Sequence, residues 1–228
     1  LIRSSTEGLA EGPPLPPPIR VAMTTTPAGL PCDPAVKAAV EAAAAYLTDA
    51  GYAVELKDPP AVAEIAERWR TIITTDSRVM SAEIFRKLGS ADFNRSFAGL
   101  TAAVPEQDLA QYMRALADRT RLLRLWALFM EDSPLVLAPV SQVPPFRQDA
   151  DLEGANRMRQ MLDEQALLYG VNLLGLPSVA IPTGLHGQSP MGVQIIGQRF
   201  REDLCLDAAA AIERKVGVLA RQLWTRTA

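Results

Sequence analysis

No spacing of residues in this 228-residue chain indicates a nucleophile beside its base. His186 is the only histidine, so any Ser-His or Cys-His catalysis would have to use it. It stands in the segment Gly184 to Ser189, where polar residues are typical of a turn. Neither a GxSxG segment nor a Ser-x-x-Lys spacing is present. We therefore predict that this chain carries no catalytic residue of its own.

The two cysteines, Cys32 and Cys205, predict free thiols rather than a disulfide. They lie far apart and show no Cys-x-x-Cys spacing, which is typical of proteins in a reducing compartment. With one histidine and no paired cysteine, a zinc site of the usual nitrogen and sulfur type would lack ligands. Nucleotide cofactors have no support, because GxGxxG and GxxxxGK[ST] are both absent. The sequence therefore predicts no metal and no cofactor.

The balance of charge and hydropathy argues against two classes of partner. Lys and Arg number 23 against 26 Asp and Glu, a net charge of -3, and no long basic segment offers a surface for nucleic acid. The longest apolar runs, such as 135–140, fall well short of the roughly 20 residues that cross a bilayer. The first residues lack a basic segment followed by an apolar one, as a secretory signal has. We predict a cytoplasmic protein with no nucleic-acid or membrane partner.

The elements that would position a site begin after a proline-rich linker over residues 1–18. Its prolines lack the N–H groups that helices and sheets need, so we expect the folded domain at residues 19–228. Alternating apolar residues over 19–24 predict a half-buried strand, and Asp33-Pro34 is typical of a helix start. With a second strand at 53–56, this segment predicts a β-α-β unit with parallel strands.

The middle of the chain is predicted to be mostly helical. Apolar residues share one helical face over 62–73 and again through 79–88. No clear period runs through Asp92 to Ala103, which we expect to be a loop. A long helix is expected over Glu106 to Glu131, with one apolar face toward the core. The residues of that inward face are Leu109, Tyr112, Met113, Leu116, Leu123, Trp126 and Met130.

The last third of the chain combines strands with helices. Leu135 to Ala138 is a continuous apolar run, which predicts a strand buried on both faces. A helix that ends at Gly170, a hairpin of strands 178–182 and 191–196, and a closing helix over 202–215 follow. Because helices and strands alternate without a fixed repeat, we predict the α/β class, with a mixed β-sheet flanked by helices.

Two motifs in this last third resemble those of the amidase signature family. The first is N-L-L-G-L-P-S-V-A-I-P-T-G over residues 172–184, and the second is G-V-Q-I-I-G over residues 192–197, before an Ala-rich helix. Members of that family close with an N-x-x-G-L-P-x-x-x-x-P-x-G stretch, then a G-V-Q-x-x-G strand and a similar helix. The resemblance covers most of residues 19–216 and implies the C-terminal portion of the amidase signature fold.

The family's catalytic segment is not among the residues that match. Members hydrolyse amides with a Ser nucleophile, a second bridging Ser and a Lys base, all upstream of the matched half. Ser4 and Ser5 have no flanking glycines, so they do not stand in for that segment. The resemblance instead implies that this half supplies one wall of the substrate pocket. The implied substrate-binding residues are Ser141, Gln142, Val143, Phe146, Gln165, Tyr169 and Asn172.

One of these positions bears on the class of substrate. Family members that make glutaminyl or asparaginyl tRNA carry an Asp seven places before the Asn that corresponds to Asn172, where this chain has Gln165. An uncharged side chain loses the charge-assisted bond to a substrate ammonium. The resemblance therefore implies a less polar amide rather than transamidation of tRNA.

Two hypotheses of different classes follow. The first is the substrate-pocket half of an amidase-like amide hydrolase, whose substrate is a small-molecule amide and whose partner is an N-terminal half or a second copy of the chain. The second is a non-catalytic binding or interaction module that folds on its own. Sequence upstream of Leu1, or the mass of the native cellular protein, would distinguish them. Because an isolated half would lack part of its cover, we also expect an apolar face large enough to drive dimerisation or association.

Overall fold

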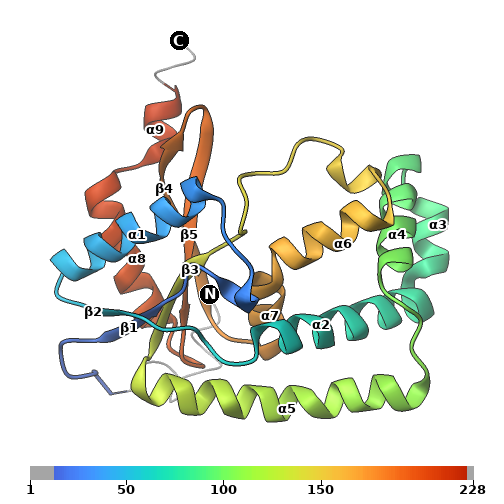
Figure 1. The fold of residues 1–228 in the computed structure, drawn as a ribbon, viewed down its shortest axis with the longest axis horizontal. Helices are drawn as coiled ribbons and strands as arrows, with labels where there is room; N and C mark the ends of the chain where they lie inside the picture. The colour runs from blue at the N-terminus through green and yellow to red at the C-terminus, as the bar shows by residue number, and fades with distance from the viewer. Residues whose placement is uncertain (1–12, 225–228) are drawn as a thin grey trace.

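In the computed structural model, which describes residues 13–224, five strands form one mixed sheet (Figure 1). The order across the sheet is β2-β1-β3-β5-β4. The strands are β1 (Arg20–Met23), β2 (Ala53–Leu56), β3 (Leu135–Pro139), β4 (Ser178–His186) and β5 (Ser189–Gly197). The predicted α/β class with a mixed sheet is confirmed.

The pairing of the strands explains the burial of β3. β1 lies parallel to β2 and to β3, whereas β5 lies antiparallel to both β3 and β4. β3 is therefore central, and all of its residues are buried. Successive side chains point to opposite faces of a strand, so Leu135 and Leu137 pack in one core, and Val136 and Ala138 in the other. The strand predicted to be buried on both faces is confirmed, as is the parallel β-α-β unit.

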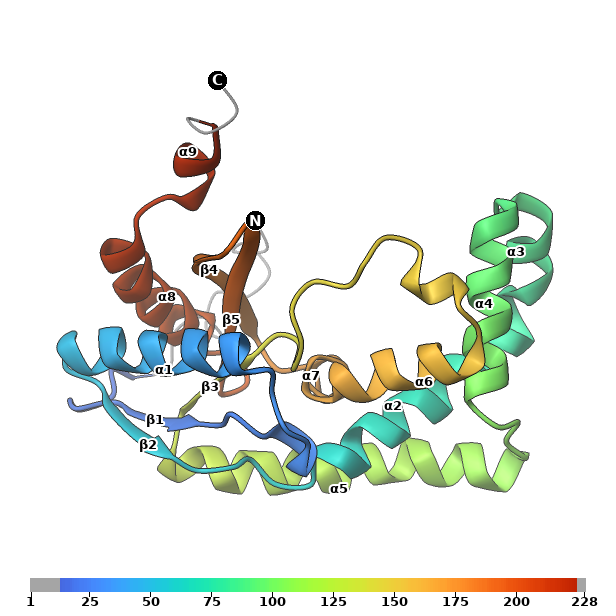
Figure 2. The same cartoon turned by 45° about the horizontal axis from the view of Figure 1, so that its top comes forward.

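Two helices, α1 (Pro34–Asp49) and α8 (Glu202–Val216), cover one face of the sheet (Figure 2). The Asp33 carboxylate caps α1, since it accepts a hydrogen bond from the Ala35 N–H at 2.8 Å. Val40 and Leu47 repeat on the inner face of α1 and pack in the same core as Val21 of β1. The helix start predicted from Asp33 is confirmed.

Three helices cover the opposite face: α2 (Val62–Asp76), α5 (Leu109–Asp132) and α7 (Ala166–Leu174). Trp126 of α5 is fully buried, and its indole Nε1 donates to the Pro60 carbonyl at 2.9 Å. Helices α2 and α7 approach closely at Gly170, where a Cβ would lie 3.1 Å from a methyl carbon of Ile65. The sheet is thus held between two helical layers.

A lobe of helices projects from the sheet at one end of the molecule (Figure 1). A π-helical segment, Ser77–Ser81, continues α2 and leads to α3 (Ala82–Leu88), α4 (Ala91–Ala103) and, later in the chain, α6 (Ala155–Glu164). A small core of Val104, Met158 and Leu162, with Trp69 packed against it, holds this lobe to α2. We refer to α3, α4, α6 and the π segment as the outer lobe.

The prediction of a loop over Asp92 to Ala103 is wrong, because helix α4 occupies this stretch. Gly99 is its one buried residue, so the sequence of α4 carries no apolar period. A start signal is nevertheless present. The Ser90 hydroxyl accepts a hydrogen bond from the Phe93 N–H at 3.1 Å, as an N-cap does.

The predicted inward face of the long helix is only partly correct. Trp126 and Met130 are buried, but Leu109, Met113 and Leu116 are exposed. The first half of α5 runs out past the sheet and under the outer lobe, as Figure 1 shows. It therefore has no sheet against which to bury these residues.

The single helix expected up to Gly170 is two helices in the structure. Helix α6 ends at Glu164 and α7 begins at Ala166, with Gln165 between them at φ −118° and ψ 21°. Helix α7 then continues to Leu174, where Gly175 ends it in the left-handed conformation at φ 66°. The break changes the direction of the chain at Gln165.

The predicted hairpin of β4 and β5 is confirmed, with longer strands and a shorter turn than expected. The turn consists of Gly187 and Gln188, and His186 is an exposed residue at the end of β4. β4 is an outermost strand of the sheet, and its pairing with β5 is irregular between Pro182 and Gly184.

The remaining elements are short: two 3₁₀ turns, Pro27–Gly29 and Ala150–Leu152, and helix α9 (Leu219–Trp224). Of the linker predicted over residues 1–18, residues 1–12 lie outside the described part of the chain. Farther along, the Pro13 carbonyl accepts a hydrogen bond from Arg201 at 3.3 Å, and Leu15 packs against the core beneath α1 and α8. This end of the predicted linker thus contacts the folded domain.

Candidate functional site

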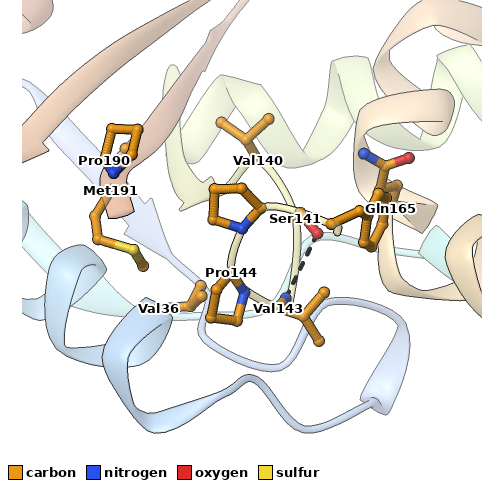
Figure 3. A pocket seen from close by; sticks show the side chains of 11 residues that line it. Val36, Val140, Ser141, Val143, Pro144, Gln165, Pro190 and Met191 are labelled. Atoms are coloured by element: carbon orange, nitrogen blue, oxygen red, sulfur yellow. Dashed lines mark hydrogen bonds between the residues drawn. The ribbon is translucent and has the colours of Figure 1, made fainter. Parts of the chain in front are cut away.

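The loops that follow the parallel strands β1 and β3 meet at the carboxyl edge of the sheet, where α/β proteins form their pockets. The loop after β3 lies between the first turn of α1 and the first residues of β5. A cavity of about 240 Å³ lies here (Figure 3). Its lining residues are Val36, Val140, Ser141, Val143, Pro144, Pro145, Phe146, Gln165, Pro190, Met191 and Gly192.

The walls of this cavity are mostly apolar. Val36 comes from α1, Met191 from β5 and Val143 from the loop after β3 (Figure 3). Ser141 and Gln165 bring the polar side chains, and the Ser141 hydroxyl accepts a hydrogen bond from the Val143 N–H at 3.5 Å. An apolar cavity with a few placed polar groups is typical of a small-molecule site.

Gln142 does not line the cavity but holds together the segments that form it. Its side chain is 2% exposed, and its amide Nε2 donates to the Leu30 carbonyl at 2.8 Å. Its backbone carbonyl accepts from the Asp33 N–H, and its backbone N–H donates to the Glu164 carbonyl, each at 2.8 Å. These bonds join the loop after β1, the loop after β3 and the end of α6.

The side chain of Gln165 is oriented by its neighbours on α7 and α2. The Tyr169 hydroxyl donates to Gln165 Oε1 at 2.7 Å, and its ring stacks on Trp69 with the ring centroids 4.1 Å apart. Burial raises the pKa of Tyr169, against the opposite effect of the Arg70 guanidinium, so the hydroxyl keeps its proton at neutral pH. With Oε1 engaged, the Nε2 group of Gln165 is the part available to a ligand.

A buried arginine anchors α6 immediately before the break at Gln165. The Arg70 side chain of α2 is 4% exposed and donates to the Leu162 carbonyl at 2.8 Å. It also pairs with Asp163 at 2.7 Å and with Glu67 at 3.0 Å. A cation at the carboxyl end of a helix is favourable because it meets the helix's unpaired carbonyls. The position of Gln165 therefore depends on the contact between α2 and α6.

The predicted pocket residues fall into two groups in space. Those that line the cavity are Ser141, Val143, Phe146 and Gln165. Those that do not line it are Gln142, Tyr169 and Asn172, of which the exposed Asn172 accepts a hydrogen bond from Trp69 at 3.4 Å. Sequence reasoning did not single out Val36 or Met191 as pocket residues. Each has the spacing of an ordinary core residue, and only the tertiary arrangement turns both toward one cavity.

Neither thiol is available as a nucleophile at neutral pH. Cys32 and Cys205 are both free, as predicted. Burial, with the Asp33 carboxylate acting in the same direction, raises the pKa of Cys32 to about 11. Burial likewise raises the pKa of Cys205 to about 12. Because the thiolate is the reactive form, both groups remain inert thiols.

One lysine and one serine do meet, but not as base and nucleophile. Lys57 Nζ lies 3.4 Å from Ser133 Oγ, and the same ammonium donates to the Asp132 carboxylate at 2.6 Å. That hydrogen bond holds the pKa of Asp132 below its usual value. Lys57 thus takes part in an ion pair, whereas a lysine base must give up its proton. The group also lies before the start of β3, whereas the cavity lies after its end.

Two other kinds of feature are absent from residues 13–224. No three or more His, Cys, Asp or Glu side chains in this part of the chain gather closely enough to hold a metal ion. None of its helices combines the length and the apolar character needed to cross a membrane.

Comparison with known sequences identifies one family. The model of the Amidase family matches residues 10–206. Indoleacetamide hydrolase from Bradyrhizobium japonicum is 39% identical over 208 residues, which cover 91% of this chain and 45% of that protein. A glutamyl-tRNA(Gln) amidotransferase subunit from Brucella ovis is 33% identical over 117 residues, which cover 50% of this chain and 24% of that protein. The chain thus spans less than half the length of these relatives.

Comparison with solved structures identifies the fold. A 6-aminohexanoate cyclic dimer hydrolase complexed with substrate matches with a TM-score of 0.70 at 22% identity, over 94% of this chain and 48% of that one. A bacterial aryl acylamidase of the amidase signature enzymes matches with a TM-score of 0.66 at 24% identity, over 86% of this chain and 43% of that one. The five-stranded sheet and its helices therefore form part of the fold that these enzymes share.

Proposed function

Because this chain belongs to the amidase family, we propose that it forms the substrate-pocket half of an amide hydrolase, an enzyme that breaks a C–N bond with water. The observation that carries the proposal is the apolar cavity at the carboxyl edge of the sheet, with Gln165 as a placed polar group. The pocket unit would be an amidase C-terminal-like domain over residues 19–228, with residues 1–18 as the linker before it.

The substrate we propose is a neutral amide with a small apolar acyl group. Val36, Val143 and Met191 offer contact to an apolar group, and the cavity of about 240 Å³ limits its size. Gln165 presents N–H donors and no charge, so it favours a hydrogen-bond acceptor over an ammonium. The relative named indoleacetamide hydrolase suggests a flat aromatic acetamide as the first ligand to test.

The chemical step would need groups from outside this chain. A Ser hydroxyl becomes a strong nucleophile only when a positioned base accepts its proton, and the tetrahedral oxyanion needs placed donors. An N-terminal half, as part of a longer chain or as a separate partner, would bring these groups to the open side of the cavity. We propose a cytoplasmic location as well, supported by the two free thiols.

The proposal is tested by the ligand preference of Gln165 variants. Indole-3-acetamide and tryptophan amide share an indole and a carboxamide, and only the second carries an ammonium. Isothermal titration of the wild-type chain should show tighter binding of indole-3-acetamide. In Gln165→Glu, the ratio of the two dissociation constants should shift about tenfold or more toward tryptophan amide, because a charge-assisted hydrogen bond contributes about 1.5–3 kcal/mol.

Gln160→Glu is the matched control, since Gln160 is exposed on α6 and does not line the cavity. It adds the same charge close by and should leave the ratio unchanged. An equal shift in both variants contradicts the proposed contact at Gln165. Failure of both ligands to bind the wild-type chain contradicts the proposed pocket.

A further inference from the structure

The loop that joins β3 to α6 forms one wall of the cavity at the sheet edge, and it is attached to Glu164, the last residue of α6, in two ways (Figure 1). The Gln142 N–H donates to the Glu164 carbonyl at 2.8 Å. Four positions along the loop, the ring of Phe146 meets the guanidinium of Arg157, which pairs with the Glu164 carboxylate. The lining residues 143–146 thus run from one attachment to the other.

The contact between Arg157 and Phe146 is a cation–π contact. Carbon Cζ of Arg157 lies over the Phe146 ring, 5.3 Å from its centroid. A cation within about 6 Å of a ring centroid is attracted by the negative charge on the face of the ring. Phe146 is half-buried and the Arg157 side chain is 24% exposed, so water screens this attraction only in part.

Arg157 is itself held in place along α6. Its Nη1 group donates to both carboxylate oxygens of Glu164, each at 3.2 Å, and to Gln160 Oε1 at 3.4 Å. Glu164 follows Arg157 by seven residues, or about two turns, so both side chains lie on one face of the helix. The place of the guanidinium over the ring is therefore fixed by α6 and does not depend on Phe146 alone.

The backbone beside Phe146 is stiff, but it does not fix the direction of the ring. Pro144 and Pro145 come directly before Phe146, and the proline ring restricts φ. This restriction places the Cβ atom of Phe146, whereas the torsions beyond Cβ still have several staggered positions. The guanidinium of Arg157 favours the position that turns one face of the ring toward it.

A ring of fixed orientation lets the cavity distinguish ligands by their flatness. Because one face of the Phe146 ring meets Arg157, the ring presents its other face or its edge to the cavity. Two aromatic rings prefer offset-stacked or edge-to-face contact, and such pairs contribute beyond the area that they bury. An aliphatic group of the same size gains only the buried area, as it does against Val36 and Met191 on the other walls.

We propose that Arg157 is a positioning residue that sets the substrate class of the cavity. Arg157 does not line the cavity, so it acts through the ring of Phe146. It favours an amide with a flat aromatic acyl group over an aliphatic amide of the same size. The inference rests on the proposed function and deepens it, since size and lack of charge alone would admit both kinds of amide.

Phenylacetamide and cyclohexylacetamide test this preference, because both are neutral and only the first has an aromatic ring. Isothermal titration of the full chain should show about three- to tenfold tighter binding of phenylacetamide. Arg157→Met keeps a long side chain without the charge, and it should bring the two dissociation constants to within about twofold of each other. Arg147→Met is the matched control, since Arg147 follows Phe146 in sequence but is 83% exposed and pairs with Glu153. It should leave the ratio unchanged.

A double-mutant cycle separates a positioning role from a general loss of structure. Phe146→Leu should abolish the preference, and addition of Arg157→Met should change it no further, because the arginine acts through the ring. Arg157→Lys keeps a cation near the ring and should retain part of the preference. An equal ratio in the wild type and in Arg157→Met, or a further change in the double variant, overturns the proposal.

Fluorine NMR of the chain with para-fluorophenylalanine in place of Phe146 tests the contact without any ligand. The resonance should shift or broaden in Arg157→Met and stay unchanged in Arg147→Met, because only the first loses a cation over the ring. An unchanged resonance in Arg157→Met overturns the positioning role. Failure of both amides to bind the wild-type chain instead overturns the proposed pocket, and the substrate class with it.

Discussion

Gln165 lies where helix α6 ends and α7 begins, and its neighbours decide which of its atoms reach a ligand. Tyr169 occupies Oε1, Trp69 fixes the ring of Tyr169, and Arg70 holds the last turn of α6. The family resemblance indicated Gln165, Tyr169 and Asn172 from their place in the sequence. It could not indicate Trp69 or Arg70, because both are distant in sequence and their contacts arise only when α2 packs against α6 and α7.

The stability of the folded chain should depend on pH through the carboxyl group of Asp203. Arg201 is buried and donates to both of its carboxylate oxygens, at 2.9 Å and 2.8 Å. This bond to Arg201 lowers the pKa of Asp203 from 3.8. A carboxyl group with a lower pKa in the folded state stabilises the fold above its unfolded pKa, and this contribution is lost as pH falls through the folded value. The contribution is therefore complete at pH 7 and declines below about pH 4.

Asp203→Asn should lower the free energy of unfolding by about 1–3 kcal/mol at pH 7, because the buried guanidinium loses its carboxylate partner. The difference from wild type should shrink as the pH falls below about pH 4, because the unfolded carboxyl then binds protons before the folded one does. Urea denaturation at several pH values measures it, with Asp207→Asn on the exposed side of the same helix as control. A difference that stays constant over this range would contradict the role given to the ion pair.

At the scale of helices and strands, the pattern of apolar residues in the sequence predicted the elements that pack on the sheet. The face of α1 is predicted well because burial on the sheet imposes a helical period on its sequence, and β3 because burial on both faces imposes a continuous apolar run. Helix α4 was missed and the first half of α5 was assigned a wrong inward face, since both lie in or under the outer lobe. There, apolar residues such as Leu109 and Met113 are exposed, so an apolar residue in the sequence no longer indicates a buried face.

Gly175 marks the end of helix α7, and its backbone conformation explains why a glycine stands there. It ends α7 at φ 66°, and a Cβ there would lie 3.5 Å from Arg119, an ordinary contact distance. The cost of a side chain is therefore the backbone conformation. Gly175→Val should lose about 1 kcal/mol or more of stability.

Gly99→Ala is the matched control for this prediction. Gly99 lies inside helix α4, and a Cβ there would meet no atom closer than 3.7 Å. Alanine should stabilise the helix by about 0.5–1 kcal/mol. Thermal denaturation should thus move the two melting temperatures in opposite directions, and a Gly175→Val variant that melts as the wild type does would show that the glycine is not needed.

At the scale of the whole molecule, the sequence predicted a mixed sheet but not the order of its strands. β3 pairs with β1 across more than a hundred residues, so no local pattern reports the pairing. The same holds for the cavity, to which α1, the loop after β3, the break at Gln165 and β5 each contribute. The family resemblance indicated part of that wall from position in the sequence, and the fold supplied Val36 and Met191.

We expect the chain by itself to show no turnover of aryl amides or esters above background. The cavity contains no base beside Ser141, and one missing oxyanion donor alone costs about 10²–10³ in rate. Incubation with a fluorophosphonate serine probe, followed by mass spectrometry, should find no labelled residue. Stoichiometric labelling that one Ser→Ala substitution abolishes would reveal a nucleophile in this chain and refute the expectation.

The irregular outer strand β4 affects how the chain behaves at high concentration. An outermost strand of this length presents a row of backbone N–H and C=O groups, onto which strands of other molecules can add without limit. Pro182 has no N–H, and the irregularity between Pro182 and Gly184 bends the row near its middle. The strand thus carries its own protection against growth into fibres.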